Sequence, residues 1–135
     1  MTSETMAAYR VVIPGVPDPE LSPNARVDRR VKARKVKQWR ETAGWAAKAA
    51  APERPLAGPL AVTATICWPR GRRRHDADNA VSLCKPLFDG LSGIVWEDDR
   101  QIVELSVRQD KLTEAGRDMW PFGCTVVDVE RIEQA

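Results

Sequence analysis

The hydrophobic pattern of this chain changes between a two-residue period, typical of strands, and a period of three to four residues, typical of helices. The clearest strand pattern is Leu60–Trp68, where every second side chain is apolar and two threonines fall between them. Successive side chains of a strand point to opposite faces, so one face of this segment is predicted to lie in the core. Shorter apolar runs predict three further strands, at Tyr9–Ile13, Ile102–Gln109 and Cys124–Ile132.

The longer of two predicted helices lies between the first two strands. It begins at Ser22-Pro23, which suit an N-cap and first turn, or up to two turns later, and it ends near Ala50. Pro52 and Pro55 forbid its continuation, because proline has no backbone N–H and clashes with the preceding turn. The apolar positions of its second half are Val36, Trp39, Ala43 and either Ala46 or Ala47.

A second helix is predicted over residues 80–92, with Asn79 as its N-cap. Pro86 lies inside this segment and removes one backbone donor, so we expect a kink or a break near Lys85. The segment from Lys111 to Gly123 is predicted to be a loop. The apolar positions of the second helix are Val81, Cys84, Phe88 and Leu91.

The order strand, helix, strand, helix, strand, strand predicts an α+β fold, with a mixed β-sheet and two main helices. The 135 residues fit a single domain, residues 1–135, of which the first eight are expected to be flexible. Four of the five tryptophans fall at apolar positions and are expected in the core, whereas the fifth, Trp120, is expected in an exposed loop. The four core candidates are Trp39, Trp45, Trp68 and Trp96.

Composition narrows the class of protein. Hydrophobic residues make up 43% of the chain and charged residues 30%, which excludes a disordered tail protein, and no apolar run is long enough for a membrane span. The three cysteines are far apart, with no CxxC pair, which argues against a disulfide framework or a zinc site. There is no glycine-rich phosphate loop, so no nucleotide cofactor is expected. We expect a cytoplasmic protein without a secretory signal or a membrane partner.

The net charge is only +2, but the basic residues are concentrated. Eight of the 21 lie between Arg26 and Arg40, and four more between Arg70 and Arg74. This asymmetry favours a polyanionic partner, nucleic acid before membrane, because neither stretch combines its charge with a strong apolar face. A solvated helix face and a basic turn are the alternative interpretation.

Acidic residues gather on both sides of the second predicted helix. Asp76 and Asp78 follow the arginines, and in an extended chain both carboxylates would point the same way. Two adjacent carboxylates repel each other unless a proton or cation lies between them, and Mg²⁺ is a hard cation that prefers oxygen ligands. Asp98 and Asp99, just before the next strand, could add a third carboxylate. A turn, a helix cap and an acidic loop would explain the same residues.

Two further side chains bear on this cluster. Lys85 lies one to two helical turns after Asn79, where its ammonium could reach a phosphate or an attacking water. It also precedes Asp89 by four residues, so a surface ion pair is the alternative. His75, next to the acids, could contact phosphate or metal. Arginines beside carboxylates make sense where a phosphodiester must be drawn into a negative site.

The acids, the lysine and the residues between them occur in an order that resembles a family signature. The run HDADN(x5)KPLFDGL(x6)DDRQI, from His75 to Ile102, resembles the signature of the RusA family of Holliday junction resolvases. Ile13-Pro14-Gly15 followed by Ser22-Pro23-Asn24 is similar to the opening strand and basic loop of that family. The resemblance covers residues 9–132, nearly the whole chain.

The resemblance implies a homodimer with a RusA-like fold, acting as a Mg²⁺-dependent endonuclease for which Mn²⁺ may substitute. It would bind four-way or other branched DNA and cut it by paired symmetric nicks in DNA recombination and repair. By position, Asp76, Asp78 and Asp99 would hold the metal, and Lys85 would stabilise transition-state charge or place the water. Lys85 follows Asn79 at a spacing about one helical turn longer than in many members, so it could still point the same way.

The same resemblance assigns further roles. His75 and Asp98 would be accessory residues. The implied DNA-binding residues are Arg72, Arg73, Arg74, Arg29, Arg30, Lys32, Arg34 and Lys35. A non-catalytic protein that binds branched DNA is the alternative function, in which the acids only order loops.

Overall fold

Four strands form one mixed sheet in the order β1-β4-β2-β3. β1 (Thr5–Pro14) pairs antiparallel with β4 (Cys124–Ile132), and β4 pairs antiparallel with β2 (Leu60–Trp68). β2 pairs in parallel with β3 (Ile102–Lys111), so that β1 and β3 are the two edges. The computed structural model describes residues 5–22, 25–50, 53–72, 74–112 and 114–132.

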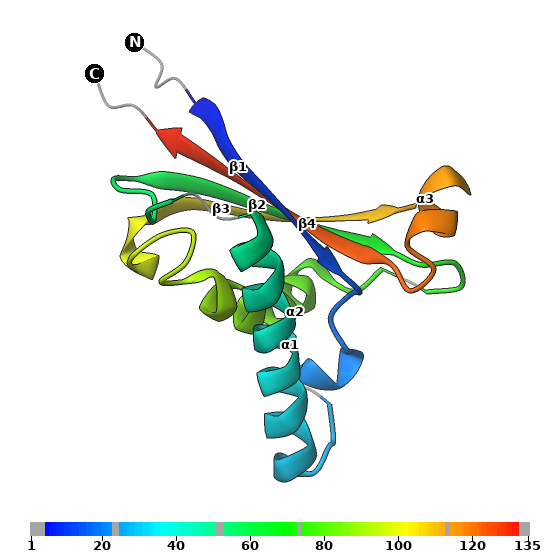
Figure 1. Cartoon of the computed structure of the whole chain (residues 1–135). Helices are drawn as coiled ribbons and strands as arrows, with labels where there is room; N and C mark the ends of the chain where they lie inside the picture. The colour runs from blue at the N-terminus through cyan, green and yellow to red at the C-terminus, as the bar shows by residue number, and fades with distance from the viewer. Residues whose placement is uncertain (1–4, 23–24, 51–52, 73, 113, 133–135) are drawn as a thin grey trace.

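Both long helices, α1 (Arg29–Ala50) and α2 (Ala77–Leu91), lie against the same face of the sheet (Figure 1). α2 connects β2 to β3, because two parallel strands need a crossover of a dozen or more residues. The predicted α+β fold with a mixed sheet and two main helices is confirmed. Within the described ranges, no helix has the length and apolar character that crossing a membrane requires.

Three short elements complete the chain. Two 3-10 turns, η1 (Pro19–Leu21) and η2 (Asp99–Gln101), precede α1 and β3, and a short helix, α3 (Glu114–Met119), precedes β4. The prediction of a loop from Lys111 to Gly123 is therefore wrong at α3. By contrast, the bounds predicted for β2 and β4 match the structure residue for residue, and β1 begins four residues before the predicted strand.

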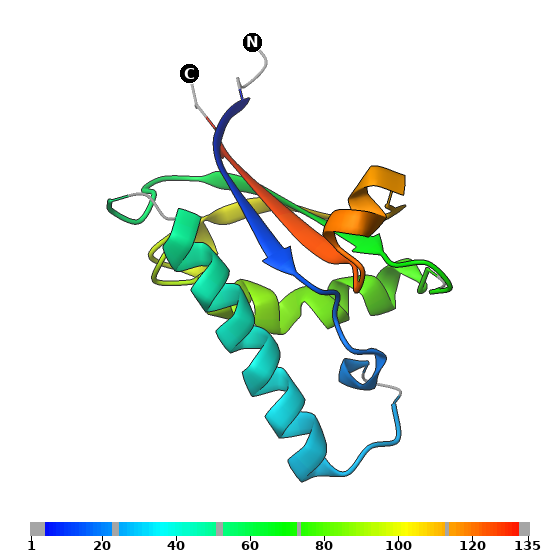
Figure 2. The same ribbon diagram turned by 45° about the vertical axis from the view of Figure 1, so that its right-hand side comes forward.

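The core lies between the sheet and the two helices. Alternate side chains of β2, from Leu60 to Trp68, are buried, as the two-residue period predicts. Trp68 and Trp96 are the largest of the completely buried side chains. On α1 the buried residues lie from Trp39 onward, and the turns before Trp39 extend away from the sheet (Figure 2).

Two predicted core residues lie at the surface. Trp45 is 72% exposed, because it follows the buried Trp39 by six residues and so points from the other side of α1. Val81 is 44% exposed, because the buried side of α2 runs through Leu83 and Leu87 instead. Cys84, predicted to be in the core, is fully buried, and burial raises the pKa of its thiol to about 12.

The N-terminus of α2 also differs from the prediction. The helix begins at Ala77, so Asp76 and not Asn79 occupies the N-cap position. Asn79 lies in the first turn, where its side-chain oxygen accepts a hydrogen bond from Ser22 Oγ at 3.5 Å. The helix continues to Leu91 with Pro86 inside it, so of the expected kink or break the break does not occur.

The two helices approach each other most closely at a glycine. A Cβ atom on Gly90 would lie 2.4 Å from the carbonyl oxygen of Arg40 and 3.1 Å from the Cβ of Ala43. On the facing helix, a Cβ on Gly44 would meet nothing closer than 3.6 Å. The short distance between α1 and α2 therefore requires glycine at position 90 and not at position 44.

We expect Gly90→Ala to lower the free energy of unfolding by about 1–3 kcal/mol, because the added methyl forces the two backbones apart. Gly44→Ala is the matched control. It has room for its methyl and higher helix propensity, so it should raise the free energy of unfolding by about 0.5–1 kcal/mol. Urea unfolding monitored by tryptophan fluorescence measures both, and equal destabilisation would contradict this account of the helix contact.

Candidate active site

Asp76 and Asp78 lie at the N-terminus of α2, directly after the arginine-rich loop that follows β2. Both residues are exposed, and no described residue forms a hydrogen bond or an ion pair with either carboxylate. Asp76 occupies the N-cap position but its side chain caps nothing. The expected extended geometry is wrong, because Asp78 is already in the helix. Both carboxylates are instead held at the helix end where the backbone N–H groups favour negative charge.

One side chain that the sequence analysis missed fixes this loop against the sheet. Gln109 Oε1 accepts hydrogen bonds from the backbone N–H of His75 at 2.8 Å and from Trp68 Nε1 at 3.0 Å. Gln109 Nε2 donates to the His75 carbonyl at 2.7 Å. The His75 ring also packs against Trp68, with ring centroids 5.1 Å apart. Gln109 therefore positions the residue immediately before Asp76.

Lys85 lies on the exposed side of α2, seven residues after Asp78. Seven residues are close to two full turns, so the two side chains share one stripe of the helix, about 10 Å apart along its axis. Among the described residues, no ion pair involves Lys85, so the alternative pairing with Asp89 is not formed. Its ammonium remains available to a substrate on the same side as Asp78.

Asp99 lies in η2, at the other end of the sheet. Its Oδ1 accepts a hydrogen bond from Trp96 Nε1 at 2.8 Å. Asp98 caps η2 and accepts hydrogen bonds from the side chain and backbone of Arg100, which lower the pKa of the Asp98 carboxyl. Asp98 thus has a structural role in holding the turn that presents Asp99.

The sheet register separates Asp99 from the other two carboxylates. Asp99 lies just before Ile102, the first residue of β3. His75, the residue before Asp76, is hydrogen-bonded to Gln109, which lies seven positions after Ile102 on the same strand. At about 3.3 Å per residue, these points on β3 are roughly 23 Å apart. Accordingly, the described residues contain no group of three Asp, Glu, His or Cys side chains that could hold a metal ion. One chain presents a two-carboxylate site and a third carboxylate far from it.

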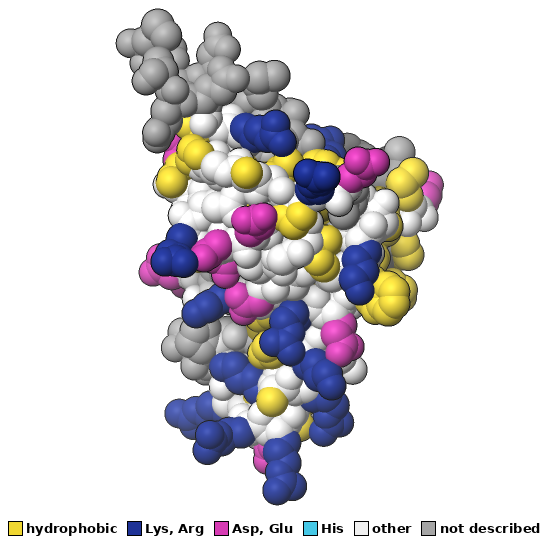
Figure 3. All heavy atoms as spheres, turned by 60° about the vertical axis from the view of Figure 1, so that its left-hand side comes forward, with side chains coloured by type: hydrophobic (Ala, Val, Ile, Leu, Met, Phe, Trp, Pro, Cys, Tyr) yellow, Lys and Arg dark blue, Asp and Glu magenta, His cyan; other side chains and the backbone are white. Residues whose placement is uncertain are grey.

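The N-terminal half of α1 forms a basic arm, in which Lys and Arg side chains cover the end of the molecule that lies furthest from the sheet (Figure 3). Arg29, Arg30 and Arg34 are exposed there. Lys35 instead bridges Asp18 at 2.7 Å and Glu20 at 2.8 Å. Part of the arm is therefore free to contact a polyanion, and part ties α1 to η1.

The lysines of the arm fasten the segment before α1. Lys32 Nζ donates to the backbone carbonyl of Ser22 at 3.2 Å. Donating hydrogen bonds to Asp18 and Glu20 raises the pKa of Lys35. Burial acts to raise the pKa of Asp18, but the hydrogen bonds from Lys35 and from the Glu20 backbone, together with the charges of Lys35 and Arg72, outweigh it and the pKa is lowered.

The arginine-rich loop adds charge beside the carboxylates. Arg72 lies over the ring of Trp68, with its guanidinium carbon 5.8 Å from the ring centroid. Arg74 is exposed, and Arg73 lies outside the described residues. The loop thus presents arginines between the end of β2 and the start of α2.

Comparison with known proteins identifies the class. The chain matches the family Endodeoxyribonuclease RusA over residues 14–117, which includes the arginine-rich loop, α2 and η2. It is 32% identical over 108 residues to an uncharacterised protein of Xylella fastidiosa (strain Temecula1 / ATCC 700964), a match that covers 75% of this chain and 67% of that protein. This chain therefore belongs to the RusA endodeoxyribonuclease family, whose members act on branched DNA and generally depend on divalent metal ions.

We expect Gln109→Ala to lower the free energy of unfolding by about 1–3 kcal/mol, because it leaves partly buried groups of His75 and Trp68 without partners. It should also weaken DNA cleavage, because the chain before Asp76 loses its anchor. Glu53→Ala, an exposed change outside the site, is the control and should alter neither property. Urea unfolding and a nuclease assay measure the two effects, and a fully stable, fully active Gln109→Ala would contradict the positioning role.

Proposed function

We propose that this protein is a Mg²⁺-dependent endonuclease that resolves four-way DNA junctions by paired symmetric nicks in recombination and repair. The observation that carries the proposal is the pair of free carboxylates, Asp76 and Asp78, next to arginines and anchored through Gln109. Structural acids are normally used in caps or ion pairs, as Asp98 is. Acids beside an anionic substrate instead need a cation between them. A binding protein without catalysis would leave this pair without a role.

A second copy of the chain would supply the third carboxylate. Asp99 is held at the start of β3, too far from Asp76 to share one ion with it in the same chain. Two nicks in opposed strands also call for two sites related by a twofold axis. The geometry within one chain and the symmetry of the product therefore both support a homodimer.

The edge strand β3 is the surface best suited to join the copies. Beyond β3 the sheet has no further strand among the described residues, and Val103 and Leu105 on β3 are 58% and 46% exposed. An open apolar edge is a pairing surface unless something covers it. Antiparallel pairing of β3 with itself would set the start of one strand beside the end of the other. Asp99 of the second copy would then lie at the end of the sheet that carries Asp76.

Each residue of such a site has its own task. Bound there, Mg²⁺ would polarise the scissile phosphate and lower the pKa of a coordinated water. Asp76, Asp78 and Asp99 supply the oxygen ligands that this ion prefers. Lys85 would stabilise the charge that develops on the phosphate, because it is the cation on the same stripe of α2 as Asp78. His75 is half-buried against the sheet and fixes the chain immediately before Asp76.

The basic arm and the arginine-rich loop would grip the junction arms through their phosphates. The exposed arginines of both segments can form bidentate contacts to phosphate oxygens. Lys32 and Lys35 add positive charge to the arm while they secure η1. Binding that rests on phosphate contacts weakens steeply with salt, because each contact releases condensed counterions. The expected DNA-binding residues remain those of the sequence analysis, Arg29, Arg30, Lys32, Arg34, Lys35, Arg72, Arg73 and Arg74.

The test of the function is cleavage of a labelled four-way junction, with a linear duplex of the same sequence as control. We expect symmetric nicks in the junction only, with Mg²⁺ or Mn²⁺ and not with EDTA. Asp78→Asn should reduce cleavage by at least about 100-fold, since it removes several kcal/mol of charge stabilisation, and should still bind the junction. Glu53→Gln, an exposed acid outside the site, should cut normally. Junction binding without cutting in any metal would instead establish the non-catalytic function.

Mixing two inactive variants tests the shared site. In a heterodimer of Asp78→Asn with Asp99→Asn, one site carries both changes and the other carries neither, if Asp78 and Asp99 of one site come from different chains. Co-refolding the two variants should therefore restore up to about a quarter of the wild-type sites. Restored cleavage would be absent if both residues acted within one chain. Co-refolding Asp76→Asn with Asp78→Asn, which alter the same half of the site, is the negative control.

A further inference from the structure

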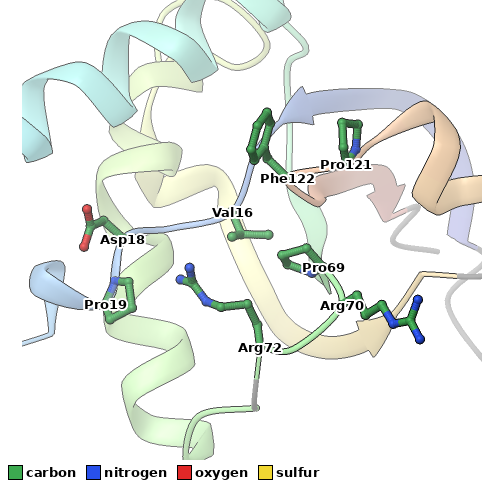
Figure 4. Close-up of a pocket in the computed structure, with 9 residues that line it drawn as sticks. Val16, Asp18, Pro19, Pro69, Arg70, Arg72, Pro121 and Phe122 are labelled. Atoms are coloured by element: carbon green, nitrogen blue, oxygen red, sulfur yellow. The ribbon is translucent and has the colours of Figure 1, made fainter.

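A concave site lies where β1 and β2 end and β4 begins, beside the arginine-rich loop (Figure 4). The hollow has a volume of about 490 Å³, within the roughly 300–1,000 Å³ of ordinary small-ligand sites. Val16 and Pro69 lie at its centre, Phe122 lies on one side, and Arg72 extends along the other toward Asp18. The hollow therefore combines an aromatic ring with a guanidinium group.

The turn that carries Phe122 is fixed from three sides. Gly123 N–H donates to the Trp120 carbonyl at 2.9 Å, and Gly15 N–H donates to the Gly123 carbonyl at 3.0 Å. Gly123 has a φ of +84°, and a Cβ there would lie 2.7–2.9 Å from atoms of three neighbouring residues. Phe122 is 81% exposed on this rigid turn. The fold thus fixes the backbone that carries this aromatic side chain, which lowers the cost of ordering it on binding.

The charge in the hollow favours an anion. Among the described residues no ion pair involves Arg72, and its guanidinium lies over the Trp68 ring. The one carboxylate that lines the hollow, that of Asp18, is already paired with Lys35 at 2.7 Å. Arg70 also borders the hollow, although its side chain points away from the centre (Figure 4). Arg72 also acts electrostatically on the Asp18 carboxylate, but among the described residues it forms no ion pair with it, so its guanidinium can still bind a phosphate.

We propose that this hollow binds one unpaired nucleotide of the DNA substrate, with its base stacked on Phe122 and its phosphate held by Arg72. Stacking on an aromatic side chain needs a base with a free face, and the faces of duplex bases are covered by their neighbours. The occupant is therefore a base that has left the stack, as at the exchange point of a junction. This inference rests on the proposed function for the source of that base.

The position of the hollow suits this role. Arg72 and Asp76 are four residues apart in sequence, so their Cα atoms are separated by at most about 14 Å. An unstacked nucleotide held between Phe122 and Arg72 would thus place the adjoining phosphates near Asp76 and Asp78. The stacking site would select branched over continuous DNA and position the strand for cutting.

A double-mutant cycle between protein and DNA tests the stacking contact. Binding is measured by fluorescence anisotropy in EDTA, on a four-way junction and on junctions in which each base at the exchange point is replaced in turn by an abasic site. Wild-type protein should lose about 5- to 150-fold in affinity at one abasic position, the range expected for stacking on one base. Phe122→Ala should bind the intact junction with that same loss and show no further loss at the abasic position. Phe122→Trp should again bind the intact junction more tightly than the abasic one.

Trp45→Ala is the matched control, because it removes another strongly exposed aromatic side chain, from α1. It should leave the effect of the abasic site unchanged. If Phe122→Ala weakens binding to intact and abasic junctions equally, or not at all, the stacking site is overturned. The same cycle on a single-stranded oligonucleotide keeps the two proposals apart. Failure to bind or cut a junction would overturn the proposed function. The stacking site would still be supported if, on the single-stranded oligonucleotide, Phe122→Ala weakens binding only when the base is present.

Discussion

The parallel pairing of β2 with β3 is the constraint on which the rest of the arrangement depends. A parallel pair cannot be closed by a tight turn, so the chain must return along the whole sheet, and α2 is that return. The carboxylates at the start of α2 and Asp99 at the start of β3 therefore lie at opposite ends of the same layer. The same crossover presses one side of α2 onto the sheet and leaves Asp78 and Lys85 together on the exposed side.

The sheet fixes the loop and the turn that carry the candidate functional side chains. Gln109 ties the loop before Asp76 to β3, and Gly123 locks the turn that carries Phe122 against the ends of β1 and β2. Both connections come from backbone and side-chain hydrogen bonds at the same end of the sheet. The side chains that we propose to hold a phosphodiester are thus attached to the hydrogen-bonded sheet, and the basic arm of α1 extends beyond it.

Local patterns predicted those parts of the fold that depend on one element at a time. The alternation of β2 and the apolar second half of α1 were enough to find their buried faces, because the side-chain period is a property of the element itself. Trp45 and Val81 were wrongly predicted to lie in the core, because an apolar side chain does not by itself indicate which side of a helix packs against another element. Gln109 left one signal, a polar residue on the inward side of a strand, but its partners lie 34 and 41 residues away in the chain.

For the candidate site, the chemical groups were predictable from the order of residues alone: two acids and a lysine around one helix, arginines before it, and a third acid before the next strand. These follow from residue type and spacing, and the family signature that they form is confirmed by the match over residues 14–117. Which of these groups meet depends on how the whole chain packs. This packing joined His75 to Gln109, put Phe122 opposite Arg72, and set Asp99 at the far end of the sheet. Strand register brings distant residues together or holds near ones apart, and it is set by the packing of the whole sheet.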